Sequence, residues 1–142
     1  MISNLYLYNI ETGLSKLILK EKRHFEAPNW LVNEKALLIN SNGKLEKISL
    51  EGEPLGILNT DQITKCNNDH GYSFDGKILF ISSGKKEVKS HTSYIYKVAA
   101  EGGVPVHITP KSPSYWHGVS PDGEDIVYCA ERNGNYDVYK MN

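Results

Sequence analysis

Apolar and polar residues alternate along this chain in short runs, and no long helical pattern interrupts them. No window of about eleven residues or more carries apolar side chains at the i, i+3, i+4 spacing of an amphipathic helix. Short apolar or alternating runs recur roughly every ten residues, separated by Gly, Asn, Asp and Pro. They include residues 5–8, 36–39, 78–81, 94–96, 126–128 and 138–139. Because aliphatic and aromatic residues dominate these runs, the pattern predicts an all-β protein built from hairpins.

Several of these runs belong to an internal repeat. The octapeptide HGYSFDGK at residues 70–77 returns as HGVSPDGE at residues 117–124, and a worn copy, PNWLVNEK, occupies residues 28–35. A following strand repeats as well, as IYKV at 95–98 and VYKM at 138–141. These spacings are close to the roughly 40–45 residues of a β-propeller repeat.

The repeat predicts how each unit folds. Asp75-Gly76 and Asp122-Gly123 supply the positive φ angles of tight hairpin turns, so each joins a first strand to the next. One four-stranded sheet cannot cover both of its faces, but neighbouring sheets packed face to face can. We therefore expect a single partial β-propeller over residues 1–142, with about three four-stranded antiparallel blades. The expected blades are residues 24–60, residues 67–110 and an incomplete blade at 114–142, and residues 1–20 supply the last strands of another.

The best-preserved repeat resembles a known family. Residues 120–128 (SPDGEDIVY) and 131–139 (ERNGNYDVY) resemble the WD40-like, PD40-type repeat of TolB-type propellers. NNDHG at 67–71 and SYWHG at 114–118 are similar to a TolB-related branch, which implies six blades and roughly twice this length. The resemblance implies the fold more than the function, because the same repeat serves periplasmic translocation proteins, peptidase propeller domains and oligosaccharide lyases.

Composition excludes some classes of function and narrows the expected location. The formal net charge of −1 and the isoelectric point near 6.5 give no attraction to nucleic acid. We expect no membrane span and no signal peptide, and two cysteines are too few for a disulfide framework. These observations predict a cytoplasmic protein, whereas the family resemblance implies the periplasm as the alternative.

The order of the predicted strands leaves the ring of blades open. The chain begins with a third strand and ends with another third strand. An open propeller exposes apolar blade faces, and such faces favour association. We expect either self-association through these open edges or completion by a missing C-terminal half of a longer protein.

Two histidines form the main candidate site. His70 and His117 begin first strands of adjacent blades, so both are expected near one mouth of the central channel. Neutral imidazoles there could bind a divalent transition metal, with Asp69 or another third residue completing the set. The oligogalacturonate lyases are similar in placing channel-mouth histidines around a metal. The alternative is structural, with each ring bonded to the backbone of a neighbouring blade.

Polar and aromatic residues next to these histidines complete the expected surface. Asn68, Asp69 and His70 would share the channel mouth with Tyr115, Trp116 and His117, although Trp116 could instead wedge between blades. Ser73 and Ser120 lie in Gly-x-Ser-x-x-Gly, which is too long for a nucleophile elbow, and no catalytic residue is predicted. The sequence favours a non-catalytic module that binds a protein or an oligosaccharide. The alternative is a metal-assisted, lyase-like enzyme that processes oligosaccharides.

Overall fold

The computed structural model describes residues 1–31, 35–84 and 92–142, and every regular element in them is a β-strand. The strands form four antiparallel sheets. The first sheet pairs β1 (Ser3–Tyr8) with β2 (Ser15–Glu21). The second contains β3 (Glu26–Trp30), β4 (Ala36–Ser41), β5 (Lys44–Ser49) and β6 (Pro54–Ile57). The third contains β7 (Cys66–Tyr72), β8 (Ile78–Ser83), β9 (Tyr94–Ala99) and β10 (Val106–His107). The fourth contains β11 (Ser114–Val119), β12 (Ile126–Arg132) and β13 (Asn135–Met141).

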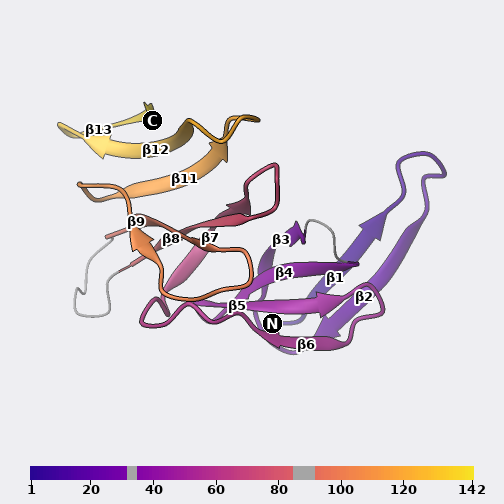
Figure 1. Ribbon diagram of the computed structural model, residues 1–142. Helices are drawn as coiled ribbons and strands as arrows, with labels where there is room; N and C mark the ends of the chain where they lie inside the picture. Colours follow the sequence, from indigo (N-terminus) through magenta and orange to yellow (C-terminus); the bar gives the residue numbers. More distant parts are fainter. Residues whose placement is uncertain (32–34, 85–91) are drawn as a thin grey trace.

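The sheets follow one another along the chain and pack face to face. In Figure 1 the β1–β2 hairpin and the β11–β13 sheet lie at opposite sides of the molecule, with the two four-stranded sheets between them. A separate apolar cluster fills each of the three gaps between consecutive sheets. Leu5 and Ile39 lie in the first gap, Leu38 and Ile81 in the second, and Phe80 and Tyr128 in the third. This arrangement confirms the predicted all-β partial propeller.

The repeated Ser-x-Asp-Gly segments form the predicted turns between first and second strands. The Ser73 hydroxyl donates a 2.7 Å hydrogen bond to the Asp75 carboxylate and accepts one of 3.0 Å from the Ile78 amide. Gly76 follows with φ of +70°, a conformation that favours glycine. The second copy repeats these bonds, so both serines belong to turn structure. In the worn copy, residues 32–34 lie outside the described part of the chain.

Candidate ligand-binding site

The first strand of each of the last three sheets has a β-bulge at nearly the same level of the repeat. The pairing register shifts between Glu26 and Asn29 in β3, between Cys66 and His70 in β7, and across His117 in β11. Bulges interrupt strand pairing and redirect side chains, and they are common beside functional sites. Three neighbouring strands are therefore irregular at one end of the stack of sheets.

Polar side chains from all three bulges come within electrostatic reach of one another. Asp69 is half-buried, and this burial raises the pKa of its carboxyl group. The nearby charge of His117 lowers the Asp69 pKa, whereas the negative charge of Glu26 raises it further. These influences place Glu26 and His117 within electrostatic range of Asp69, although the three residues come from three different sheets.

Two tyrosines of the fourth sheet extend this group. The hydroxyl groups of Tyr115 on β11 and Tyr136 on β13 are hydrogen-bonded to each other. Burial is the largest cause that raises the pKa of Tyr115, and the charges of Tyr136 and Asp69 add to it. Tyr136 stays 53% exposed. The pair therefore presents phenol groups to solvent beside the Asp69 carboxylate.

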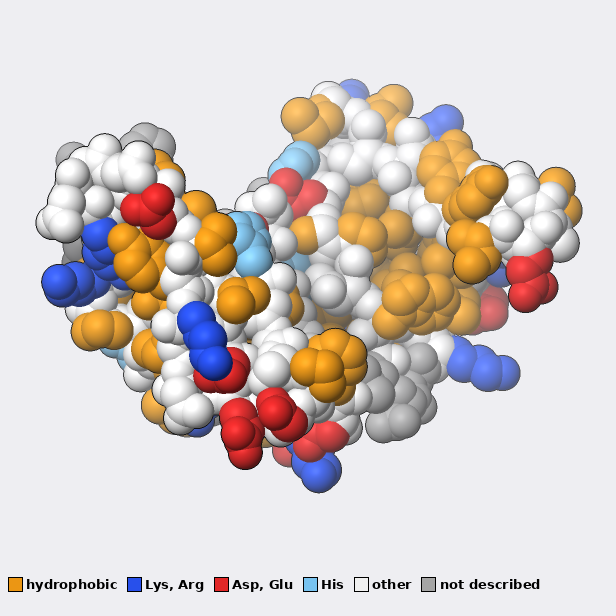
Figure 2. Space-filling model, turned by 90° about the horizontal axis from the view of Figure 1, so that it is seen from above, with side chains coloured by type: hydrophobic (Ala, Val, Ile, Leu, Met, Phe, Trp, Pro, Cys, Tyr) orange, Lys and Arg blue, Asp and Glu red, His pale blue; other side chains and the backbone are white. Residues whose placement is uncertain are grey.

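We call Glu26, Asp69, Tyr115, His117 and Tyr136 the bulge site. His24 adjoins it, with its Nε2 atom 3.5 Å from Glu26 Oε2. Figure 2 shows histidine and acidic side chains close together in the hollow at the middle of one face. The site thus combines carboxylates, imidazoles and phenols, a composition suited to a polar ligand that also offers apolar area.

His70 lies elsewhere than the sequence predicted. Its side chain is 3% exposed, so it is not at the channel mouth. Burial lowers its pKa to about 4, although the nearby backbone of Asn67 and Leu38 offsets part of this effect. Neither ring nitrogen has a well-aligned hydrogen bond to a described residue. The link to the second sheet runs instead through the His70 carbonyl, which accepts a 3.0 Å bond from the Asn29 side chain.

Trp116 also has a structural role. It packs between two blades, which is the alternative that the sequence left open. Its ring is stacked with that of Phe80 at a centroid distance of 5.9 Å, and its amide donates a 2.8 Å bond to Ser82. The ring lies so close to Gly71 that a Cβ atom there would come within 2.5 Å of it. Trp116 therefore holds the third and fourth sheets together. Asn68 and His117 are exposed, and their contact with a ligand stays a prediction.

The described residues do not assemble the metal site considered from the sequence. Within residues 1–31, 35–84 and 92–142, no group of three or more His, Cys, Asp and Glu side chains could hold a metal ion. The physical reason is that His70 turns into the interior while Asp69 is half-buried and His117 is exposed. The set of His70, His117 and Asp69 is therefore divided between two environments.

Glu26 and Tyr136 were missed by the sequence analysis. Glu26 lies two residues before the worn repeat, at the position that Asn68 and Tyr115 hold in the two better copies, but a glutamate occurs there in neither of them. Tyr136 follows an Asn-Gly turn in a strand predicted only as blade structure. Asp69 did have a local signal, because the Asn67 side chain accepts a 2.9 Å bond from its amide, an Asx turn that shapes the bulge.

A separate groove of about 420 Å³ lies between the third and fourth sheets. Phe80, Ile126 and Met141 are among its lining residues, and no member of the bulge site lines it. Its apolar walls belong to the packing gap between these sheets. The convergence of titratable groups therefore lies at the bulge site and not in this groove.

Comparison with known proteins gives two extensive matches. An uncharacterized protein of Agrobacterium fabrum (strain C58) is 42% identical over 142 residues, which cover 99% of this chain and 47% of that protein. A solved TolB-type structure from Agrobacterium tumefaciens is 41% identical with a TM-score of 0.88, and the match covers 98% of this chain and 50% of that one. The chain thus spans about half the length of the relatives that it matches.

More distant structures share the fold. TolB from Acinetobacter baumannii is 16% identical with a TM-score of 0.73, over 96% of this chain and 34% of its own. No family model matches the sequence. Among the described residues there is no helix long and apolar enough to cross a membrane. The all-β sheets and the TolB-type matches together show that the chain belongs to the TolB-related family of β-propellers.

Proposed function

We propose that this part of the propeller is a non-catalytic binding surface, and that the bulge site holds a protein or oligosaccharide ligand. The observation that supports this most strongly is the convergence of three bulged first strands. Each strand departs from regular pairing at or next to a residue of the bulge site. The bulge of β11 also places Trp116 between the third and fourth sheets, so the polar residues beside the bulges, and not the bulges alone, support a binding role.

Three candidate nucleophiles, Ser73, Ser120 and Cys66, are poorly placed for covalent catalysis. Ser73 and Ser120 are engaged in the Asp-Gly turns. Burial raises the pKa of the Cys66 thiol to about 12, which leaves it protonated and unreactive at neutral pH. The metal-assisted, lyase-like alternative has less support, because His70 is buried away from Asp69 and His117.

Other expectations remain proposals about the whole protein. The division into blades at residues 1–20, 24–60, 67–110 and 114–142 stays a prediction, as does completion of the ring by self-association or by further chain. The comparisons give no support to a cytoplasmic location, and the periplasmic alternative follows from the family resemblance alone.

A two-panel binding screen tests the proposed function. The ¹⁵N-labelled chain is titrated with short peptides of differing charge and with neutral and acidic oligosaccharides, and amide chemical shifts are recorded. At least one ligand class should shift the amides of Glu26, Asp69, Tyr115 and His117 together. His117→Gln should weaken that binding, whereas His107→Gln, on the outer strand β10, serves as the matched control. The proposal is wrong if no ligand in either panel binds, or if every ligand that binds shifts amides elsewhere in the chain.

A further inference from the structure

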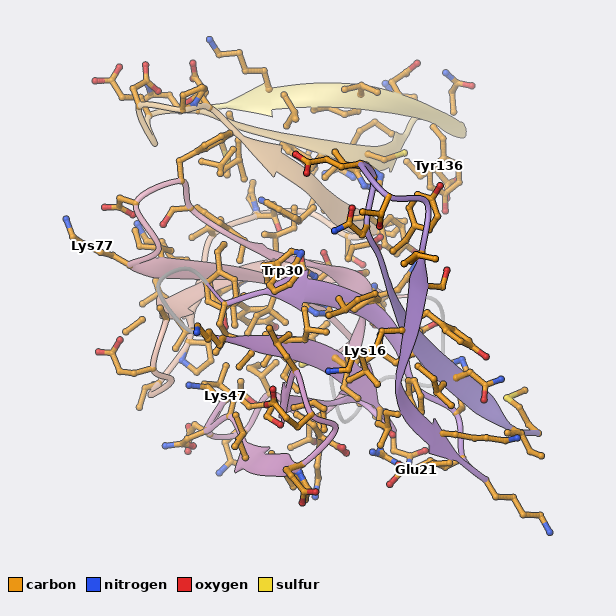
Figure 3. All side chains as sticks on the ribbon, turned by 90° about the vertical axis from the view of Figure 1, so that its right-hand side faces the viewer. Lys16, Glu21, Trp30, Lys47, Lys77 and Tyr136 are labelled. Atoms are coloured by element: carbon orange, nitrogen blue, oxygen red, sulfur yellow. The ribbon has the colours of Figure 1, made fainter. Side chains whose placement is uncertain are left out.

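The fourth sheet has an open edge formed by its last strand. Among the described strands, β13 pairs with β12 alone. All seven residues of β13 pair with β12 in one unbroken register. In Figures 1 and 3, β13 (yellow) lies along the outer margin of the molecule. The backbone groups on the side of β13 away from β12 therefore have no strand partner in the described chain.

The other sheet edges differ from this one. Natural sheets limit unwanted pairing with very short edge strands, with proline or with β-bulges. Every other edge strand that the structure describes carries one of these features. β10 has two residues, and β6 has four and begins with Pro54. Register shifts interrupt the pairing of β1 with β2, β3 with β4, β7 with β8 and β11 with β12. Among the described edges, only β13 is long, regular and open.

The repeat shows which backbone groups of β13 point outward. Val138 corresponds to Ile95 of β9 in the repeated segments VYKM and IYKV. The Ile95 carbonyl accepts a 2.9 Å bond from the Ile108 amide, and the Ile95 amide donates a 2.9 Å bond to the Thr109 hydroxyl. In the described part of the fourth sheet no strand follows β13 to satisfy the equivalent groups. The amide and carbonyl of Val138 thus face the open edge.

The residues on both sides of Val138 extend this edge. Because backbone direction alternates along a strand, Tyr136 and Lys140 present their amides and carbonyls on the same side as Val138. Tyr136 is 53% exposed and Val138 is 76% exposed. Aromatic and β-branched residues are favoured in strands, so the composition of the edge suits further pairing.

The charges on β13 do not protect the edge as free charges would. Lys140 Nζ lies 2.6 Å from Asp125 Oδ2. The Asp137 carboxylate accepts a 2.9 Å bond from the Asn135 side chain. Both charged groups are thus engaged within their own sheet, whereas protective edge charges point freely into solvent.

We propose that β13 joins two copies of this chain edge to edge, as an antiparallel pair with a two-fold axis at Val138. Two-fold antiparallel pairing places one residue opposite its own copy, and Val138 is the middle one of the three outward residues. Tyr136 then lies opposite Lys140 of the second copy, and no like charges are opposed. A second copy fits because this register is self-complementary and makes about six N–H···O bonds. The pairing is independent of the ligand proposed for the bulge site.

Hydrogen exchange of the unmodified chain tests the pairing without any substitution. Light scattering at NMR concentration should give about twice the chain mass of 16.0 kDa, and dilution should give the monomer. Exchange at the amides of Tyr136, Val138 and Lys140 should slow by about tenfold when about nine-tenths of the chains are dimeric. The amides of Asp137 and Tyr139 face β12, so their protection should not depend on concentration.

Val138→Asp and Val138→Lys test the register. Each variant places two like charges opposite each other and should weaken dimerisation by roughly tenfold or more. An equimolar mixture of the two should dimerise more strongly than either variant alone, because opposite charges then face each other across the axis. Val104→Asp and Val104→Lys are the matched controls, since Val104 is 75% exposed and lies outside β13. These controls should dimerise like the parent.

Three results would overturn the proposed pairing. They are a monomer at every concentration, a dimer whose added protection falls on other amides, and a mixture that dimerises no better than the separate Val138 variants. Because Val138 is exposed, these variants should keep the amide spectrum of a folded chain. None of these results decides the ligand titration of the bulge site, which is read at amides of β3, β7 and β11.

Discussion

His70 and His117 occupy the same position in two copies of one octapeptide, yet the fold gives them opposite environments. His70 in β7 is 3% exposed, and burial lowers its pKa to about 4. His117 in β11 is exposed and lies near Asp69. In both copies the glycine after the histidine pairs with the equivalent position of the second strand, which is β8 in the third sheet and β12 in the fourth. The difference therefore begins immediately before that glycine.

The position of the bulge explains the contrast. In the third sheet His70 pairs with Ile81, and the bulge lies earlier in β7. In the fourth sheet the residue equivalent to Ile81 is Tyr128, which pairs with Trp116, so His117 is the extra residue of the bulge. A shift of one residue moves a side chain to the other face of a strand. Trp116 thus takes the interior place that His70 has in the preceding sheet.

The largest effect expected from this contrast is a pH-dependent loss of stability at His70. Its folded-state pKa of about 4 lies below the ordinary value of 6.5, so the unfolded chain takes up the proton first as the pH falls. Between these two values the free energy of unfolding should decrease by as much as about 3 kcal/mol. Urea titrations from pH 7 to 4 of the parent, His70→Gln and His117→Gln measure this loss. If the free energy of unfolding of His70→Gln falls with decreasing pH as steeply as that of His117→Gln, the loss of stability does not come from His70.

The two glycines give the next largest effect. A Cβ atom at Gly71 would meet the Trp116 ring at 2.5 Å, whereas at Gly118 it would meet the Val127 side chain at 3.3 Å. Gly71→Ala should therefore cost about 2 kcal/mol through overpacking, and Gly118→Ala should cost less than about 1 kcal/mol. Denaturant midpoints of the two variants test this order, and equal losses would show that Trp116 moves freely out of the way.

A smaller effect is expected at Ser82, whose hydroxyl accepts the Trp116 amide bond across the gap between sheets. Ser82→Ala should cost about 1 kcal/mol, since the amide next to the bulge loses its acceptor. Hydrogen exchange at the Trp116 amide should accelerate more than at Tyr128, which lies in regular pairing. Unchanged protection of the Trp116 amide would mean that Ser82 does not hold the β11 bulge in place.

The smallest effect on stability is expected at His117. His117→Gln should change the free energy of unfolding by no more than about 0.5 kcal/mol, because the side chain is exposed. Its effect should fall instead on ligand binding at the bulge site. A large loss of stability in this variant would place His117 with His70 as a packing residue and remove the contrast between the two copies.

Most of the fold was predictable from local chemistry, and only part of the site was. The Asp-Gly turns, the short apolar runs and the repeat spacing indicate the hairpins and the propeller. The same repeat is misleading at His70, because equal position in the repeat does not mean equal exposure. Glu26 holds the repeat position of Asn68 and Tyr115, but its approach to Asp69 depends on the packing of the second sheet on the third.

The amino-acid sequence by itself determined that this protein is a partial TolB-related propeller with tight Ser-x-Asp-Gly turns, because turn conformations and strand patterns depend on residues close together in the chain. Only the tertiary structure decided which repeated side chains face the hollow. Trp116 packs on Gly71 and bonds to Ser82, and both contacts come from the neighbouring sheet. Contacts between sheets set where each bulge lies, and a bulge displaced by one residue is enough to bury one histidine and expose the other.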